Sequence, residues 1–133
     1  MGNYFESYLR KIDFNKKLKN LERKLNKKKI IIYGTGTFFQ FIHNNYNLKK
    51  LNIIGISDMK YSVEQEGKID LDYPIVPKQM IVKYNPDYIL VATENYINII
   101  EDFELKYLKD TKIKILPLAK KNLIDTLKRI WNL

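Results

Sequence analysis

The sequence contains no cysteine and a single histidine, His43. Without thiols the chain cannot form a disulfide, a thiolate metal site or a cysteine nucleophile. One histidine also excludes a metal cluster built from several histidines of one chain, and no Ser/His/Asp set stands out around it. We therefore predict no metal site and assign no catalytic residue from the sequence.

Long apolar runs are also missing, and glycine and proline occur only five and four times. No run approaches the roughly 18 residues that a membrane-spanning helix needs. The N-terminus has no apolar segment of the kind found in secretory signals. These absences favour a cytoplasmic protein. The 133 residues, 45% of them hydrophobic and 29% charged, are typical of one globular domain.

The net charge of +9 is unevenly distributed along the chain. Residues 1–29 carry ten Lys/Arg against three Asp/Glu, residues 30–103 carry six against nine, and residues 104–133 carry eight against three. A uniform nucleic-acid-binding face would not divide its charge in this way, so we predict that nucleic acid is not a partner. A solvated surface is the favoured interpretation. Basic ends that attract an anionic membrane or an acidic partner are an alternative.

The spacing of apolar residues predicts helix over residues 3–29. Its phase changes near Asp13, which could cap a second helix. Beyond it, Leu18, Leu21 and Leu25 repeat like a short heptad. This row either packs on the domain or forms the seam of a homodimer.

After residue 29, apolar strands alternate with amphipathic helices, a pattern typical of parallel βαβ units. Right-handed crossovers then favour the strand order 2-1-3-4. We predict an α/β fold: a Rossmann-like parallel sheet of about four to five strands with flanking helices and an N-terminal helical arm. The predicted strands are 29–33, 52–57, 88–92 and 112–116, and the predicted helices are 37–46, 96–108 and 119–131, with a polar loop over 59–73 and one or two helical turns over 78–84.

Three segments follow from these elements. Residues 1–29 form a basic amphipathic helical arm, residues 30–118 a Rossmann-like nucleotide-binding domain, and residues 119–133 a C-terminal amphipathic helix. The last helix places apolar residues of 123–131 on one face.

A Gly-x-Gly turn lies directly between the first predicted strand and the first helix of the sheet. Gly34 permits the tight turn, and Gly36 lets a phosphate approach the backbone. The helix that starts near Thr37 presents free N–H groups and a partial positive charge to an anion. The predicted phosphate-binding residues are Gly34, Thr35, Gly36, Thr37 and Phe38.

The third glycine of the usual G-x-G-x-x-G pattern is replaced by Phe39. That glycine lets the helix pack closely on the strand. A phenylalanine at this position should therefore push the helix outward or point away from the sheet.

Asp58 lies at the end of the second predicted strand, 22 residues after Gly36. Dinucleotide-binding folds place a carboxylate there to bind a ribose hydroxyl, and a negative charge disfavours a 2′-phosphate, so NAD is favoured over NADP. The alternative is that Asp58 caps a turn. Ala92, Thr93 and Glu94 follow the third strand and should face the same crevice, where Thr93 either binds the ligand or caps the next helix.

The order IIIYGTGTFFQFI, NIIGISD, GKIDLDYPIV and PDYILVAT resembles the Rossmann-like nucleotide-binding domains of bacterial polysaccharide-biosynthesis proteins, which modify sugar nucleotides for capsules and surface glycans. The resemblance spans about residues 28–95. It implies that Gly34 and Gly36 form the phosphate turn and that Asp58 lies against the ribose or base. It also implies that the segment connecting the second and third strands forms a hook with Gly67, Tyr73, Pro74 and Val76. Asp87 would directly precede the third strand.

The resemblance implies a module that binds a nucleotide or nucleotide-sugar and serves surface-polysaccharide synthesis together with a partner enzyme. NAD or a nucleotide-sugar is the implied ligand. The relatives carry their catalytic domain elsewhere, so we do not expect the isolated chain to be catalytic. The alternative is an assembly protein with a degenerate nucleotide site, which dimerises or docks through residues 18–25 and 123–131.

Overall fold

A computed structural model describes residues 2–121 as an α/β fold around a four-stranded parallel sheet. The strands lie in the order β2-β1-β5-β6, which is the predicted order of the second, first, third and fourth strands. Their bounds are β1 (Ile30–Tyr33), β2 (Ile53–Ser57), β5 (Tyr88–Val91) and β6 (Lys114–Pro117). The Rossmann-like fold class predicted from the sequence is confirmed.

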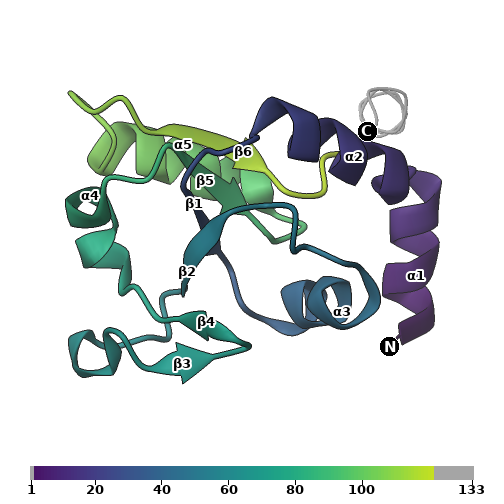
Figure 1. The fold of residues 1–133 in the computed structure, drawn as a ribbon, viewed down its shortest axis with the longest axis horizontal. Helices are drawn as coiled ribbons and strands as arrows, with labels where there is room; N and C mark the ends of the chain where they lie inside the picture. The colour runs from purple at the N-terminus through teal and green to yellow at the C-terminus, as the bar shows by residue number, and fades with distance from the viewer. Residues whose placement is uncertain (1, 122–133) are drawn as a thin grey trace.

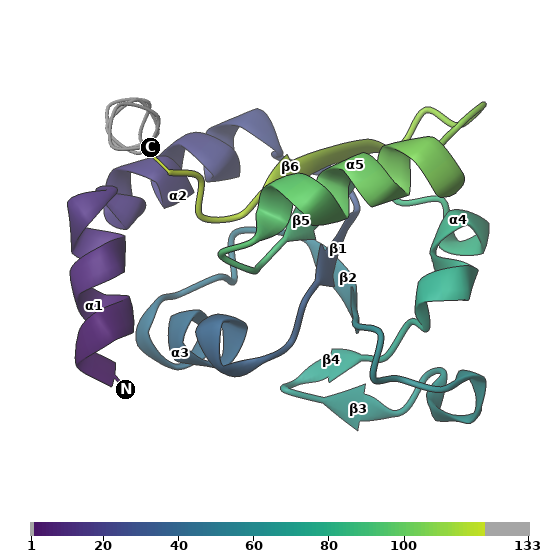
Figure 2. The ribbon, with the colours of Figure 1, turned by 180° about the vertical axis from the view of Figure 1, so that it is seen from behind.

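Helices cover both faces of this sheet (Figures 1 and 2). On one face lie α1 (Gly2–Lys11), α2 (Phe14–Lys24) and α3 (Thr37–Asn45); on the other lie α4 (Ile81–Tyr84) and α5 (Tyr96–Lys106). Successive residues of a strand point to opposite faces of the sheet and pack into the two hydrophobic cores in turn. Ile30 and Ile32 pack with the first set of helices, and Ile31 and Tyr33 with the second. Burial on both faces explains why the strands are continuous apolar runs.

Smaller elements connect β2 to α4. They are η1 (Val63–Gln65), the antiparallel pair β3 (Ile69–Asp70) and β4 (Tyr73–Pro74), and η2 (Lys78–Met80). The predicted polar loop over 59–73 therefore contains a short hairpin. The helical turns predicted over 78–84 are confirmed as η2 and α4. Most of the predicted helix 119–131 lies outside the described residues.

The N-terminal arm is broken where its apolar phase changes. Asp13 adopts a left-handed conformation (φ 53°) between α1 and α2, and its side chain makes no capping hydrogen bond. It therefore occupies the predicted N-cap position of α2 and turns the chain there, but its side chain does not cap the helix. Leu18 and Leu25 are 6% and 1% exposed within the core of this same chain. These leucines of α2 pack inside their own chain, so the interpretation of this row as a dimer seam is wrong. The other segment proposed for dimerisation, 123–131, lies outside the described residues.

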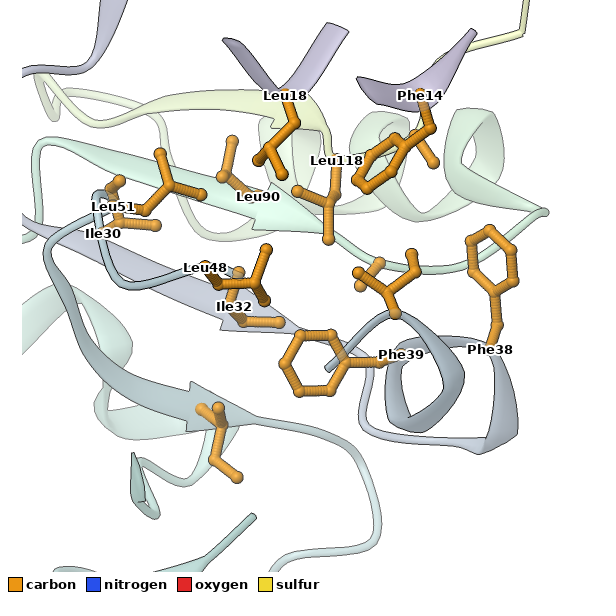
Figure 3. Packing of buried hydrophobic residues seen from close by; sticks show 14 of the residues in the cluster. Phe14, Leu18, Ile30, Ile32, Phe38, Phe39, Leu48, Leu51, Leu90 and Leu118 are labelled. Atoms are coloured by element: carbon orange, nitrogen blue, oxygen red, sulfur yellow. The ribbon is translucent and has the colours of Figure 1, made fainter. Parts of the chain in front are cut away.

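Phe39 points into the core between α3 and the sheet, where it is fully buried near Ile32 and Leu48 (Figure 3). The expectation that it points away from the sheet is wrong. Its ring also stacks on His43, with the two ring centres 5.9 Å apart. The space that a glycine would close is therefore filled by an aromatic side chain.

Candidate functional site

Gly34 occupies a position that only glycine fits well. Its φ is +104°, and a Cβ there would lie 2.7 Å from Cγ2 of Thr93 and 3.3 Å from the carbonyl oxygen of Ala92. Its backbone N–H donates to the carbonyl of Ser57, at 2.8 Å. The turn after β1 is thus packed closely between the ends of its two neighbouring strands.

Gly36 differs from Gly34 because a Cβ built on it would have no atom within 4 Å. Its φ of −78° is available to any residue. No described residue accepts a hydrogen bond from the backbone N–H of Gly36, Thr37 or Phe38. Together with the dipole of the nine-residue α3, these N–H groups form a site that favours an anion.

Thr35 is fully buried, and four hydrogen bonds to three side chains hold it in place. Its N–H and hydroxyl donate to Oδ2 of Asp58, at 2.8 Å and 3.2 Å. Its carbonyl accepts from Nε2 of Gln40 at 3.0 Å and from Nζ of Lys60 at 3.3 Å. The loop conformation is therefore fixed by one side chain from α3 and two from the segment directly after β2.

Asp58 fixes the loop and also retains some capacity to accept a ligand. A carboxylate has about four lone-pair sites. Three hydrogen bonds reach Asp58 from described residues: two from Thr35 and one from the N–H of Lys60, at 3.1 Å. About one site is left for another donor. The ribose contact stays a prediction, and the turn-fixing alternative describes the contacts that this structure contains.

The loop after β5 brings its three predicted residues to the same edge of the sheet. Ala92 is buried and its N–H donates to the carbonyl of Tyr33, at 2.8 Å. The N-cap of α5 is Asn95, so the alternative that Thr93 caps this helix is wrong. Glu94 accepts a hydrogen bond from the hydroxyl of Tyr4, at 2.7 Å, which ties this loop to α1.

Two buried hydroxyls flank Gly34. The side-chain oxygens of Ser57, at the end of β2, and Thr93, after β5, have no hydrogen-bond partner among the described residues. Buried polar atoms are normally paired with protein or water. These two hydroxyls therefore have donor and acceptor capacity at the carboxyl edge of the sheet, where open α/β sheets bind their ligands.

The side chain of Phe38 belongs to the core rather than to the crevice. It is 6% exposed, and its ring lies 5.3 Å from that of Phe5 and 5.7 Å from that of Tyr8, both on α1. Of the predicted phosphate-binding residues, Phe38 therefore contributes its backbone N–H alone. Helix α1 covers α3 on the side away from the sheet (Figure 1).

Sequence reasoning missed Lys60, Gln40 and Tyr61 around this loop. The ammonium of Lys60 lies beside the glycine turn and adds positive charge there. The hydroxyl of Tyr61 donates to Oδ2 of Asp70, at 2.6 Å. Burial and this hydrogen bond raise the pKa of Tyr61 to about 12. The available signal for Lys60 and Tyr61 was their place within three residues of Asp58, and for Gln40 a polar residue in the first turn of the helix after the glycine turn.

A second cluster lies on the α5 face of the same strands. Nζ of Lys78 lies 3.3 Å from Oδ2 of Asp102 and 5.0–5.4 Å from the ring centres of Tyr33, Phe103 and Tyr107. Burial, followed by the negative charges of Asp58, Tyr107 and Asp102, raises the pKa of Tyr33 to about 12. The neutral phenol is thus strongly favoured in the folded protein.

The high pKa of Tyr33 predicts an alkaline loss of stability. Its folded-state pKa of about 12 exceeds the ordinary value of 10.0, so the stabilisation is complete below pH 10 and is lost as the pH rises towards 12. We expect the free energy of unfolding of the wild type to fall by roughly 2 kcal/mol more than that of Tyr33→Phe across this window. Urea unfolding at a series of pH values measures the difference, and parallel pH profiles would contradict it.

No group of three or more His, Cys, Asp or Glu is placed to hold a metal ion in residues 2–121. Within the same residues, no helix has the length and hydropathy to cross a membrane.

Comparison with known proteins identifies the family of the chain. The model of the family described as C2185-like, N-terminal, matches residues 26–116, which is more than half of the chain. The curated proteins gave no match. Two solved structures of RSP are similar: RSP with β-NAD+ and operator DNA (TM-score 0.48, 19% identity) and RSP with β-NADH (TM-score 0.45, 17% identity). Each match covers 85% of this chain, and this chain spans only 60% and 64% of the two RSP chains. At these identities the similarity concerns the fold alone.

These findings correct two of the expectations from the sequence. The first is the prediction that nucleic acid is not a partner, which one of the matched structures contradicts: RSP is bound there to operator DNA as well as to β-NAD+. The assignment to the polysaccharide-biosynthesis domains is also wrong, because a different family model matches. The Gly-x-Gly turn and the aspartate after the second strand occur widely in Rossmann-like folds and do not identify one pathway. The chain belongs to the C2185-like N-terminal family.

Proposed function

We propose that this chain binds a nucleotide at the turn between β1 and α3, with an NAD-type dinucleotide as the first candidate. The observation that carries the proposal is the open set of N–H groups at Gly36, Thr37 and Phe38 beside a glycine that leaves room for a phosphate. A Rossmann-like sheet binds its ligand at this edge, where the strand order reverses.

The surrounding residues suit a diphosphate and a ribose. The three N–H groups would bind phosphate oxygens, and the ammonium of Lys60 beside the turn would offset their charge. The remaining acceptor capacity of Asp58 would take a ribose hydroxyl. The buried hydroxyls of Ser57 and Thr93 would gain a polar partner from the ligand. Ala92 and Glu94 would form the wall of the crevice after β5.

Asp58 also bears on the choice between NAD and NADP. A carboxylate at the end of the second strand accepts from a free ribose hydroxyl and repels a 2′-phosphate. Because Asp58 also holds Thr35, its substitution would disturb the loop as well as the ligand. A variant that blocks the space for a phosphate and leaves the loop contacts intact gives a sharper test.

Gly36→Ala is that variant. The new methyl group meets no protein atom within 4 Å, so the apoprotein should unfold at nearly the wild-type temperature. The same methyl would occupy the space beside the open N–H groups and weaken phosphate binding. We expect at least a tenfold loss of affinity for NAD+ or NADH, measured by isothermal titration calorimetry and by the thermal shift.

The matched control is Asn44→Ala, an exposed position later in α3, which should bind as the wild type does. Ligand at 100 times its dissociation constant stabilises a folded protein by about 2.7 kcal/mol. NADP+ should produce a smaller shift than NAD+. Absence of a shift with NAD+, NADH, NADP+ and AMP, or equal binding by Gly36→Ala, would reject the proposal.

A further inference from the structure

A basic groove runs between α2 and the loop that leads from α3 into β2. Its volume is about 800 Å³. Lys16, Lys19 and Arg23 line the α2 wall at spacings of three and four, which places them on one helix face. Lys50 lies on the opposite wall, and Glu22 is the one acidic residue of the lining. Folding thus gathers four cations from two separate segments around a concave surface.

These four cations are available to a ligand. Lys16, Lys19, Arg23 and Lys50 are exposed, and none forms an ion pair with another described residue. The guanidinium of Arg23 donates to Oδ1 of Asn20, which lies on the preceding turn and also lines the groove. A guanidinium has five N–H donors, so most of them stay free for an acceptor.

We propose that this groove binds the phosphate backbone of nucleic acid without reading the base sequence. Seven residues separate Lys16 from Arg23, or roughly 10 Å along α2. That length spans about three phosphates of one strand of B-form DNA. Lysine and arginine side chains on both walls of a groove are suited to such a backbone, because phosphate contacts position a duplex without specifying its sequence.

The composition of the groove distinguishes nucleic acid from two other anionic partners. A membrane-binding surface would add large apolar side chains that enter the lipid. A protein interface would provide an aromatic or aliphatic anchor. The exposed large hydrophobic residues of the described chain all lie elsewhere, and none is on α2 or in the 46–52 loop. A groove lined by four cationic side chains, two asparagines and one glutamate therefore favours a polyanion.

The test is fluorescence anisotropy of a labelled DNA duplex of random sequence, titrated with the full chain at several salt concentrations. Binding by up to four cations predicts a slope of log K against log salt of about −3 to −4. Lys16→Glu/Lys19→Glu should reduce the magnitude of the slope by about 2 and lower the affinity in about 0.1 M salt by at least tenfold.

The matched control is Lys109→Glu/Lys112→Glu, which changes the net charge equally. These residues lie between α5 and β6, at the other end of the molecule from α2 in both views (Figures 1 and 2). The control should keep nearly all of the affinity, and circular dichroism should show that both variants are folded. Gly36→Ala should bind the duplex as the wild type does, which separates this site from the proposed nucleotide site.

Three outcomes would overturn the proposal. The first is an equal loss of affinity in both double variants, which would indicate a net-charge effect. The second is the absence of salt-dependent binding to the duplex. The third is binding to vesicles of phosphatidylcholine and phosphatidylserine, with none to the duplex, which would assign the groove to an anionic membrane.

Discussion

Phe39→Ala is expected to lower the free energy of unfolding by about 4 kcal/mol. Phe39 has no exposed surface and lies in the layer between α3 and the sheet (Figure 3). Removing its ring leaves a cavity that Ile32, Leu48 and the ring of His43 can fill only in part. The loss is a large share of the 5–15 kcal/mol that stabilises a typical domain.

Urea denaturation of wild type and variant, fitted with a common slope, measures this loss. Phe39→Leu is the conservative comparison and should lose less than half as much, because most of the buried volume is kept. Phe39→Gly would complete the three-glycine pattern of dinucleotide-binding turns. It should nevertheless be less stable than Phe39→Ala by about 1 kcal/mol, owing to the poor helix propensity of glycine. A loss below 1 kcal/mol for Phe39→Ala would show that α3 can move in to close the space.

The sheet could be predicted because its strands are unusual in composition. Each residue of β1 and β5 is buried, and a continuous apolar run of that length is compatible with few other structures once helices alternate with it. The handedness of parallel crossovers then restricts the strand order. The local apolar pattern and the rule for crossovers therefore indicate the same fold. This agreement explains why the strand order could be predicted, and most element bounds to within a few residues.

The parts that could not be predicted depend on contacts between distant residues. The sequence places Asp58 at the correct edge of the sheet, but its bonds to Thr35 depend on the path of the glycine turn. The three-glycine pattern suggested a misfit at Phe39, whereas the packing of α1, α2 and the sheet provides a place for its ring. Charge counted along the chain likewise missed that Lys50 faces α2 across a groove.

Gly34→Ala is expected to lower the free energy of unfolding by about 3 kcal/mol, from two sources. The first is the backbone, because a φ of +104° is strained for any residue with a Cβ. The second is the contact of 2.7 Å that the new methyl would make with Cγ2 of Thr93. Close packing between the ends of neighbouring strands leaves little room to relax, and such overpacking costs about 1–3 kcal/mol.

Thr93→Ser separates these two sources, since it removes Cγ2 and keeps the hydroxyl. We expect Gly34→Ala to cost about 1 kcal/mol less in the Thr93→Ser background, a coupling that a double-mutant cycle in urea measures directly. The backbone strain and the approach of 3.3 Å to the carbonyl of Ala92 remain in both backgrounds. Gly36→Ala, two residues away, is the local control and should change stability by less than about 0.5 kcal/mol. Equal losses for Gly34→Ala and Gly36→Ala would contradict the division of this turn into a structural glycine and a ligand-facing one.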